Sequence, residues 1–260
     1  DRSVSRGLGD VYKRQVLGDI LQQGLPTADT DFTRKLFANY TTQEVIGKSI
    51  KDKRGGENNI HSWDIDLKGK TSQKERDLMS ALLRERRKKH WAEVIGIKWM
   101  DGMPLTEEQI RTFFNVPELH QILEHLTQMG YLVYEYPKQQ VKGKDGIVKR
   151  IPDETKDKGY NIVAGKLSFE FSKILDTNDI APTLVAMDVA KLGVVDGDGI
   201  RRLTIRECQR LCGYPDNYNL DMISESEAFD LLGNTVCVPV IKDISERIGR
   251  SYLENVEGGR

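Results

Sequence analysis

The sequence RRLTIRECQRLCGYPDNY, at residues 201–218, specifies a short helix in which both ends are marked. Thr204 and Glu207 stand in the order of a capping box, in which each side chain bonds the backbone amide of the other residue. A cap of this kind stabilises a helix by about 1 kcal/mol. Gly213 follows at the position of a C-terminal cap, and Pro215 prevents the helix from continuing. We therefore predict a capped helix between Thr204 and Gly213.

A second helical signal follows in GNTVCVPVIKDI, at residues 233–244. Apolar residues at every fourth position predict one apolar helix face, formed by Val236, Val240, Ile244 and Ile248. Pro239 is tolerated only in the first turn of a helix, so we predict that this helix begins near Gly233 and Asn234. Outward-facing amides at such a helix start suit a carboxylate or a phosphate, although a simple Gly-Asn turn explains the pair as well.

The two segments resemble the ninth and tenth sequence motifs of the DNA (cytosine-5) methyltransferase family. The ninth motif is matched by Arg201, Leu203, Thr204, Arg206, Glu207, Arg210, Leu211, Gly213, Tyr214, Pro215 and Asp216. The tenth motif is matched by Gly233, Asn234, Val236, Val238 and Val240. Ile205 stands where the family usually has proline and Cys212 where it usually has glutamine, and neither change disturbs the predicted cap.

The resemblance implies an enzyme that transfers a methyl group from S-adenosyl-L-methionine to C5 of cytosine in double-stranded DNA. Such an enzyme turns its target base out of the duplex, and a cysteine thiolate attacks the ring. By the same resemblance, Asn234, Thr235 and Val236 contact the methionine end of the cofactor. The ninth motif is expected to form a scaffold for the recognition region, through Arg201, Thr204, Arg206, Glu207, Arg210, Gly213 and Pro215.

The parts that perform the chemistry are not found in this sequence. The family's catalytic cysteine follows a proline, which is true of none of Cys208, Cys212 and Cys237, and the cofactor loop F-x-G-x-G is missing. A Glu-Asn-Val triplet at residues 254–256 follows the tenth motif instead of preceding the ninth, so we treat it as a coincidence. We therefore expect no catalytic residue in this chain. We expect a fragment that carries target recognition and part of the cofactor site and is inactive alone.

Two alternatives remain open. One is a non-enzymatic DNA-binding protein built on a winged helix, and the other is the recognition subunit of a split methyltransferase. The resemblance places the protein in the cytoplasm of a bacterium or in a phage. Its expected partner is double-stranded DNA, with a restriction endonuclease system or a separate catalytic chain as further candidates.

Composition is compatible with each of these classes. A chain of 260 residues with 38% hydrophobic and 30% charged residues can bury a core. Because the formal net charge is -1, any contact with nucleic acid must come from local basic patches. Three cysteines and no disulfide pattern favour a reducing compartment. Cys208 and Cys212 are predicted to be buried small side chains, and no metal site or membrane span is expected.

The expected fold is α+β, with a small target-recognition domain and the C-terminal helix of an α/β methyltransferase domain. Residues 1–15 have no apolar periodicity and look like a translated sequencing adaptor, whereas VLGDIL, at residues 16–21, resembles the segment after the eighth motif. We assign residues 16–100 to the start of the recognition region and residues 101–165 to a winged-helix-like segment. Residues 166–220 end the recognition region with the ninth motif, and residues 221–260 hold the tenth motif and the C-terminal helix.

The winged-helix prediction rests on the order of elements after Met103. Thr106 and Gln109 form a second capping box, and Pro117 opens a further helix. The core-facing residues of that helix are predicted to be Leu119, Ile122, Leu123 and Leu126. A strand at residues 131–136 and the turn KGKDG before IVKRI then predict a basic hairpin. Its wing would carry Lys138, Lys142, Lys144, Lys149 and Arg150, and it could contact either DNA or protein.

Candidate DNA contacts are Lys142 and Lys144 on this hairpin and Thr183 and Lys191 after it. Thr183 lies in PTLVA, at residues 182–186, which resembles the end of the family's target-recognition region. Basic segments at residues 47–59 and 84–91 are either further phosphate contacts or solvated surface. Before the second of these, a helical stripe of core residues is predicted from Leu78, Met79, Leu82 and Leu83. Alternation of apolar and polar residues predicts strands at residues 63–67 and 167–175.

Overall fold

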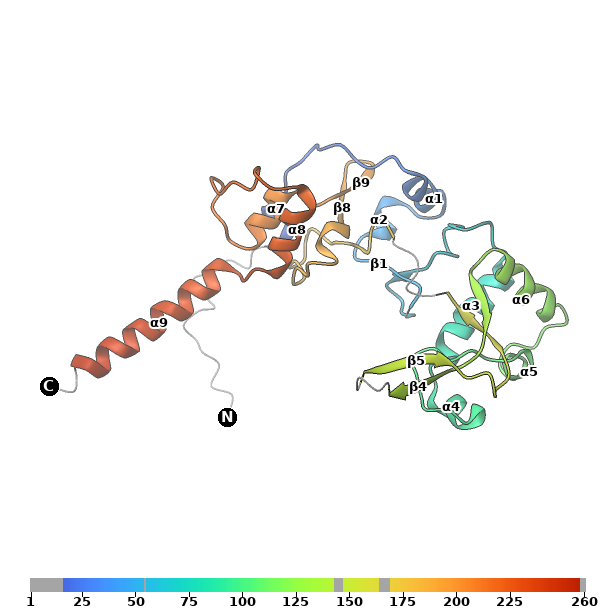
Figure 1. Ribbon diagram of the computed structural model, residues 1–260. Coiled ribbons are helices and arrows are strands. Elements are labelled where there is room, and N and C mark those ends of the chain that lie inside the picture. The colour runs from blue at the N-terminus through green and yellow to red at the C-terminus, as the bar shows by residue number, and fades with distance from the viewer. Residues whose placement is uncertain (1–15, 54, 143–146, 164–168, 258–260) are drawn as a thin grey trace, which may run out of the picture. The chain divides into compact units, whose positions relative to one another are not determined.

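The computed structural model describes residues 16–53, 55–142, 147–163 and 169–257. The predicted adaptor at residues 1–15 and the candidate contact Lys144 lie outside these residues. Helices and strands are mixed throughout the described chain, as predicted for the α+β class (Figure 1). The chain divides into two compact units: unit 1 contains the chain up to residue 29, residues 41–47 and the chain from residue 171 onward, and unit 2 contains residues 30–40 and 48–170.

Unit 1 holds the stretch 201–218 and is built around three short paired strands. Its elements are η1 (Leu17–Asp19), α2 (Thr42–Val45), β7 (Lys173–Ile174), η2 (Val189–Lys191), β8 (Leu192–Asp196), β9 (Gly199–Arg202), α7 (Ile205–Leu211), α8 (Glu225–Asn234) and α9 (Val238–Glu257). Strand β8 pairs in parallel with β7 and in antiparallel with β9. Gly197 makes the β8–β9 turn with a φ of 59°. The core of the unit joins η1, β8, α7 and α8 through Leu17, Leu192, Val194, Leu203, Cys208, Phe229 and Leu232.

The last described helix, α9, is one long helix that follows α8 after a short extended segment (Figure 1). The predicted helix with Pro239 in its first turn is confirmed, but the predicted start near Gly233 and Asn234 is wrong. Those two residues end α8, and the chain is extended at Thr235 before α9 begins at Val238. The reason is a capping box formed upstream by Ser224 and Glu227, which starts a separate helix. Within the described residues, no helix is both long and apolar enough to cross a lipid bilayer.

Unit 2 combines helices with short pairs of strands. Its elements are α1 (Asp31–Asn39), β1 (Ser49–Ile50), β2 (Asn59–Ile60), α3 (Gln73–Glu85), α4 (Lys89–Ile95), α5 (Glu107–Arg111), α6 (Leu119–Gln128), β3 (Leu132–Glu135), β4 (Lys138–Lys142), β5 (Val148–Pro152) and β6 (Gly159–Ile162). Strands β1 and β2 pair in parallel, whereas β3 pairs with β6 and β4 with β5 in antiparallel. The predicted helical stripes are confirmed, because the core contains Leu78, Met79, Leu82 and Leu83 of α3 and Leu119, Ile122, Leu123 and Leu126 of α6.

The predicted elements after Met103 form, but the predicted pairing of the strand at 131–136 with IVKRI is wrong, because β3 pairs with β6 and a separate strand, β4, pairs with β5. The capping box of Thr106 and Gln109 opens α5, and strand β3 lies within the predicted range 131–136. The hairpin forms between β4 and β5, and the larger part of its turn, residues 143–146, lies outside the described residues.

Two strand predictions fare less well. The predicted strand at residues 63–67 is wrong, because residues 62–68 form turns. Asp66 has a left-handed φ of 52° and its carboxylate accepts a hydrogen bond from the amide of Thr71 at 2.8 Å, which bends the chain. Trp63 and Ile65 are nevertheless fully buried, so their apolar character served packing instead of a strand. Of the predicted strand at 167–175, the structure shows β7 alone among the described residues.

Candidate functional site

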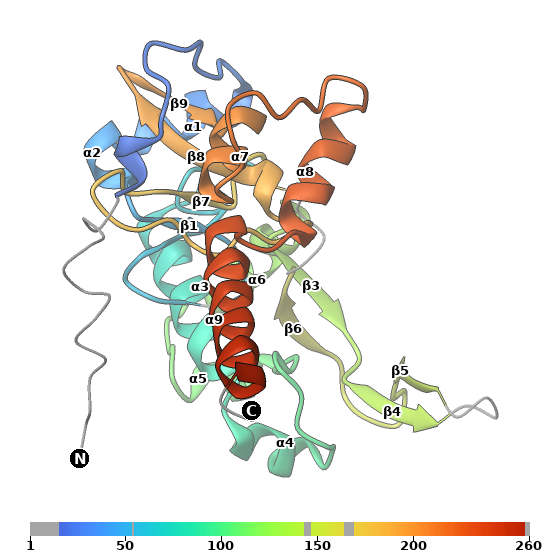
Figure 2. The ribbon, with the colours of Figure 1, turned by 90° about the vertical axis from the view of Figure 1, so that its left-hand side faces the viewer.

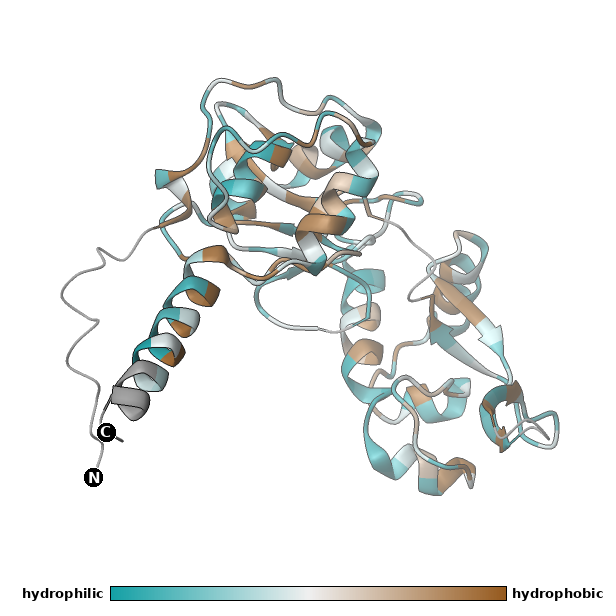
Figure 3. Ribbon diagram, turned by 60° about the vertical axis from the view of Figure 1, so that its left-hand side comes forward, coloured by the Kyte–Doolittle hydropathy of each residue, from teal (hydrophilic) through white to brown (hydrophobic). Residues whose placement is uncertain are grey.

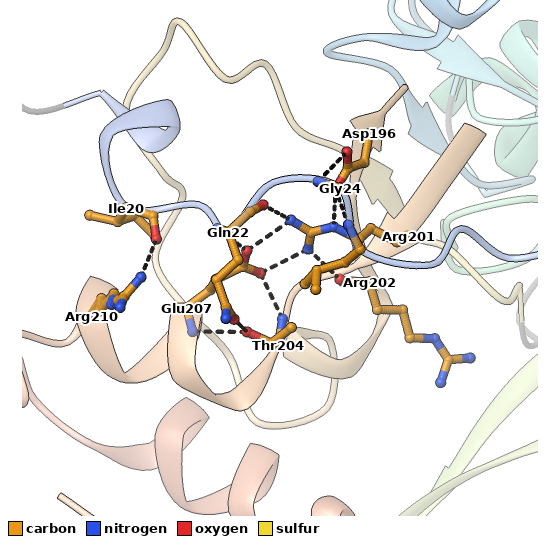
Figure 4. Close-up of polar contacts among 10 residues, drawn as sticks. Ile20, Gln22, Gly24, Asp196, Arg201, Arg202, Thr204, Glu207 and Arg210 are labelled. Atoms are coloured by element: carbon orange, nitrogen blue, oxygen red, sulfur yellow. Dashed lines mark hydrogen bonds and ion pairs between the residues drawn. The ribbon is translucent and has the colours of Figure 1, made fainter. Parts of the chain in front are cut away.

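Arg201 lies at the centre of a buried charged network in unit 1, which Figure 4 shows. Its guanidinium donates two parallel hydrogen bonds to Glu207, with Nη1–Oε2 and Nη2–Oε1 distances of 3.0 and 2.9 Å. Its Nε donates to Oδ2 of Asp196 at 2.7 Å. Desolvation opposes the charge of Arg201, but the hydrogen bonds to Glu207 and Asp196 outweigh it and raise the pKa of Arg201. The guanidinium is therefore a fixed, paired cation.

Glu207 also closes the predicted capping box, which is confirmed. The amide of Thr204 donates to Oε2 of Glu207 at 2.8 Å, and the amide of Glu207 donates to Oγ1 of Thr204 at 3.1 Å. The same carboxylate accepts the amide of Gln22 at 2.8 Å, and Arg201 donates to the carbonyl of Gln22 at 2.5 Å. Thus one buried carboxylate joins the cap of α7 to a segment at the start of the chain.

Asp196 forms hydrogen bonds with the residues that follow Gln22. Its carboxylate accepts the amides of Gly24 at 3.1 Å and Leu25 at 3.2 Å. The hydrogen bond from Arg201 is the main reason that the pKa of Asp196 is lowered. Neither Gln22 nor Asp196 carried a signal in the sequence, because their partners are fixed by tertiary structure alone.

The other residues of the ninth motif hold the ends of α7. Arg206 donates to the carbonyl of Tyr218 at 3.2 Å, and Arg210 donates to the carbonyl of Ile20 at 3.2 Å. The carbonyl of Pro215 accepts the amide of Tyr218 at 2.9 Å in the turn that follows. Gly213 has a φ of 75°, and a Cβ there would lie 2.3 Å from Cδ of Pro239. The glycine is therefore required both by the helix end and by the close passage of α9.

The cysteines are structural where they are buried. Cys208 and Cys212 are free and buried, as predicted, and Cys237 is free and exposed. Burial raises the pKa of the Cys208 thiol to about 12. A thiol of this kind carries almost no thiolate at neutral pH, so it is unsuited to nucleophilic attack.

The three predicted cofactor contacts lie where α8 ends, with Asn234 as its last residue and Thr235 and Val236 in the connector to α9. Asn234 is exposed, and its Nδ2 donates to the carbonyl of Asp230 at 2.9 Å. Oγ1 of Thr235 lies 2.8 Å from the hydroxyl of Tyr214, and Val236 is 59% exposed. A Cβ on Gly233 would lie 2.2 Å from the backbone nitrogen of Ala186, so the end of α8 packs closely on the segment containing PTLVA.

This connector does not offer the helix start that the sequence suggested for an anion. The amide of Val238, at the start of α9, already donates to the carbonyl of Cys212 at 2.8 Å, and Pro239 has no amide. The exposed amide side chain of Asn234 and the exposed side chain of Val236 remain available to a ligand. They present one amide and one aliphatic side chain, without the contribution of a helix start.

The predicted DNA contacts fall in different units. Lys142 is exposed on β4 of unit 2, whereas Thr183 is exposed and Lys191 is half-buried in unit 1. In the basic segment 84–91, Arg84, Lys88 and Lys89 are exposed, but Arg86 is a correction because it is buried and donates to Oδ1 of Asn161 at 2.7 Å. Burial lowers the pKa of Arg86 to about 10. Arg86 therefore belongs to the interior of unit 2 and is neither a DNA contact nor a solvated charge.

Comparison of the whole sequence with known proteins identifies the family of this chain. The family model described as "C-5 cytosine-specific DNA methylase" matches residues 10–250, and the chain belongs to that family. Among curated relatives, it is 58% identical over 232 residues to the Type II methyltransferase M.NlaIV of Neisseria lactamica, covering 89% of this chain and 53% of that protein. It is 56% identical over 232 residues to M.NgoBV of Neisseria gonorrhoeae, with the same shares of both chains. It is 38% identical over 246 residues to M.HgiCI of Herpetosiphon aurantiacus, covering 93% of this chain and 52% of that one. The chain thus spans about half the length of these relatives.

Proposed function

We propose that this chain carries the target-recognition region and one wall of the cofactor site of a DNA (cytosine-5) methyltransferase. The complete enzyme would transfer a methyl group from S-adenosyl-L-methionine to C5 of cytosine in double-stranded DNA. The groups that attack the base and hold most of the cofactor would come from the part of the enzyme that bears Pro-Cys and F-x-G-x-G. On this proposal, the chain is inactive alone.

The observation that carries the proposal is the bare apolar face of α9 (Figure 3). Val240, Ile244 and Ile248 recur every fourth residue and are 53%, 48% and 65% exposed. A row of half-exposed aliphatic side chains on one helix is costly in water and marks an interaction surface. In the family that the sequence resembles, this helix packs beside the cofactor-binding sheet. We propose that the α9 face is covered by that sheet.

The chain's own residues would bind and orient. When bound, S-adenosyl-L-methionine supplies the methyl group. Asn234 would present its amide, Thr235 would be held in place by Tyr214, and Val236 would cover an apolar part of the ligand. The Arg201 network would keep α7 and β8–β9 rigid beneath the recognition region, as a scaffold. The winged-helix-like segment at 101–165 would contact DNA through its basic hairpin.

The same bare face favours a second candidate, the recognition subunit of a split methyltransferase. In that case the covering sheet belongs to a separate chain that carries the catalytic motifs. Both candidates predict that a catalytic half added in trans restores activity.

The experiment compares the chain alone with the chain mixed with the part of the Neisseria lactamica relative that it does not cover. Alone, we expect binding of a hydrophobic dye and no transfer of label from S-adenosylmethionine to duplex DNA. In the mixture, we expect the dye signal to fall and labelled DNA to form. Ile244→Asp on the α9 face should abolish this recovery, whereas Lys242→Asp, at a position exposed on the same helix, should not. Transfer by the chain alone, or equal effects of the two substitutions, would contradict the proposal.

A further inference from the structure

The β4–β5 hairpin has two faces of different chemistry. Cross-strand partners share a face, and successive residues of a strand point to opposite faces. The pairs Lys138↔Pro152, Gln140↔Arg150 and Lys142↔Val148 therefore define one face, which we call the Gln140 face. The pairs Gln139↔Ile151 and Val141↔Lys149 define the other, which we call the Gln139 face.

Neither face packs against the rest of unit 2. Every residue of β5 is exposed, and so is every residue of β4 except the half-buried Lys138. In Figure 2 the ribbon projects away from the helices of the unit. A two-stranded ribbon without a packed face is marginally stable in water. A bare ribbon of this kind is therefore best explained as a surface that a partner covers.

The charge of the ribbon identifies the partner. The sequence KQQVKGKDGIVKRIP, at residues 138–152, contains five basic residues and one acidic residue. Lys138 is paired with Glu135 at 2.9 Å. Among the described residues, Lys142, Lys149 and Arg150 form no ion pair. Unpaired cations on a projecting ribbon complement the phosphates of duplex DNA.

We infer that this ribbon enters the major groove of the target duplex with its Gln140 face toward the bases. This inference rests on the proposed function. The major groove is about 12 Å wide and admits a two-stranded ribbon. Arg150 is placed to bond O6 and N7 of a guanine, and Gln140 to bond N6 and N7 of an adenine. Lys142 contacts a phosphate and adds affinity without sequence preference.

The register explains why the Gln140 face reads the bases. Gln140 and Arg150 are direct cross-strand partners, so their Cβ atoms are about 5 Å apart, which matches side chains that reach neighbouring base pairs. The planar fork of arginine matches a guanine edge with two bonds, whereas lysine acts as a point charge. On the opposite face Gln139 is paired with Ile151 and Lys149 with Val141, so no two polar side chains are direct cross-strand partners there.

The two faces provide matched controls in one experiment. The chain is used to select duplexes from a pool with a randomised central segment, and the preferred bases are read by sequencing. We expect Arg150→Ala to lose the preference for guanine at one position, by about 5- to 150-fold. Gln140→Ala should relax the preference at a neighbouring position. Gln139→Ala and Lys149→Ala change the same or similar side chains on the other face and should leave the preferred bases unchanged.

The groove is tested by changing a single atom of the DNA. Replacing the selected guanine by 7-deazaguanine removes its N7 acceptor from the major groove. We expect this change to weaken binding by the unmodified chain and to have no added effect on Arg150→Ala. Lys142→Ala should weaken binding to all sequences alike and reduce the dependence on salt.

The outcomes separate this inference from the proposed function. If the unmodified chain selects no sequence at all, the proposed recognition role is refuted. If it selects a sequence that Arg150→Ala and Gln140→Ala both retain, recognition stands and the ribbon inference is overturned. The ribbon inference is also overturned if Gln139→Ala or Lys149→Ala loses the base preference equally, or if 7-deazaguanine does not weaken binding by the unmodified chain. All five substituted side chains are exposed, so unchanged circular dichroism is expected for each variant.

Discussion

Replacing Arg201 by alanine should destabilise unit 1 more than any other substitution in the stretch 201–218. The Arg201 side chain is 5% exposed and that of Glu207 is fully buried. Without the guanidinium, the carboxylate of Glu207 is left in the interior with only the backbone amides of Gln22 and Thr204 as partners. Removing one member of a buried ion pair costs about 3–5 kcal/mol, chiefly because the other charge is left uncompensated. We expect the free energy of unfolding to fall by this amount.

The chain contains a reporter for each unit. All three cysteines lie in unit 1, and Cys208 and Cys212 are buried, whereas all three tryptophans, at residues 63, 91 and 99, lie in unit 2. The rate at which a thiol reagent labels the two buried cysteines therefore measures the opening of unit 1. A loss of 3–5 kcal/mol corresponds to labelling faster by about 150- to 5,000-fold. The urea transition followed by tryptophan fluorescence should change less.

Arg202 supplies the matched control, because it is the next residue on β9 and its side chain is exposed. Arg202→Ala should change the labelling rate by less than about threefold, as for most exposed substitutions. Arg201→Lys keeps the charge but loses the planar fork, so its labelling rate should lie between those of Arg201→Ala and the unmodified chain. If Arg201→Ala and Arg202→Ala behave alike, the buried network is not what holds unit 1 together.

Three further expectations concern a glycine, a thiol and a lysine. Gly213→Ala should destabilise unit 1 by about 1–3 kcal/mol in urea unfolding, because Gly213 has a positive φ and contacts Pro239. Gly249, on α9, has open space around it, so Gly249→Ala should instead stabilise that helix by up to about 1 kcal/mol. Because the pKa of Cys208 is raised from 9.0 to about 12, this thiol adds to the free energy of unfolding at pH values below 9.0, and the added stability should be lost as the pH rises from 9.0 toward about 12. If Cys208→Ala loses as much stability over the same pH range, the thiol is not the cause. Binding to duplex DNA should weaken steeply with salt, and Lys142→Ala should make the slope shallower; an affinity that does not depend on salt would show that the basic hairpin is not the contact.

Local signals in the sequence predicted local structure well. The caps at Thr204 and Thr106 depend on residues three positions apart, and both form as expected. The apolar stripes of α3 and α6 are also set by spacing alone, and all of their predicted residues are buried. A short-range pattern succeeds in these places because the tertiary structure does not compete with it.

Other predictions failed where distant residues decide the structure. The alternating run at residues 63–67 has the pattern of a strand, but the Asp66–Thr71 hydrogen bond bends it into turns. Arg86 lies in a run of charged residues, yet its side chain is buried and donates a hydrogen bond to Asn161, which is 75 residues away in the sequence. The start of α9 was misplaced because the cap at Ser224 belongs to a helix that the apolar spacing did not show. The candidate cofactor residues consequently lie at the end of α8 and in the connector after it, instead of at a helix start.

The stretch 201–218 shows how the two kinds of signal combine. Its cap on Thr204 is visible in the sequence and contributes about 1 kcal/mol, so Thr204→Ala should be mild. Arg201 contributes more to stability, and its partner Gln22 lies 179 residues away and cannot be inferred from spacing. Removing Arg201 should therefore cost about three times as much as removing the cap, because it leaves the buried Glu207 carboxylate uncompensated. The stretch 201–218 therefore joins α7 to residues far away in the sequence, through Arg201 and Glu207 to Gln22 and through Arg210 to Ile20.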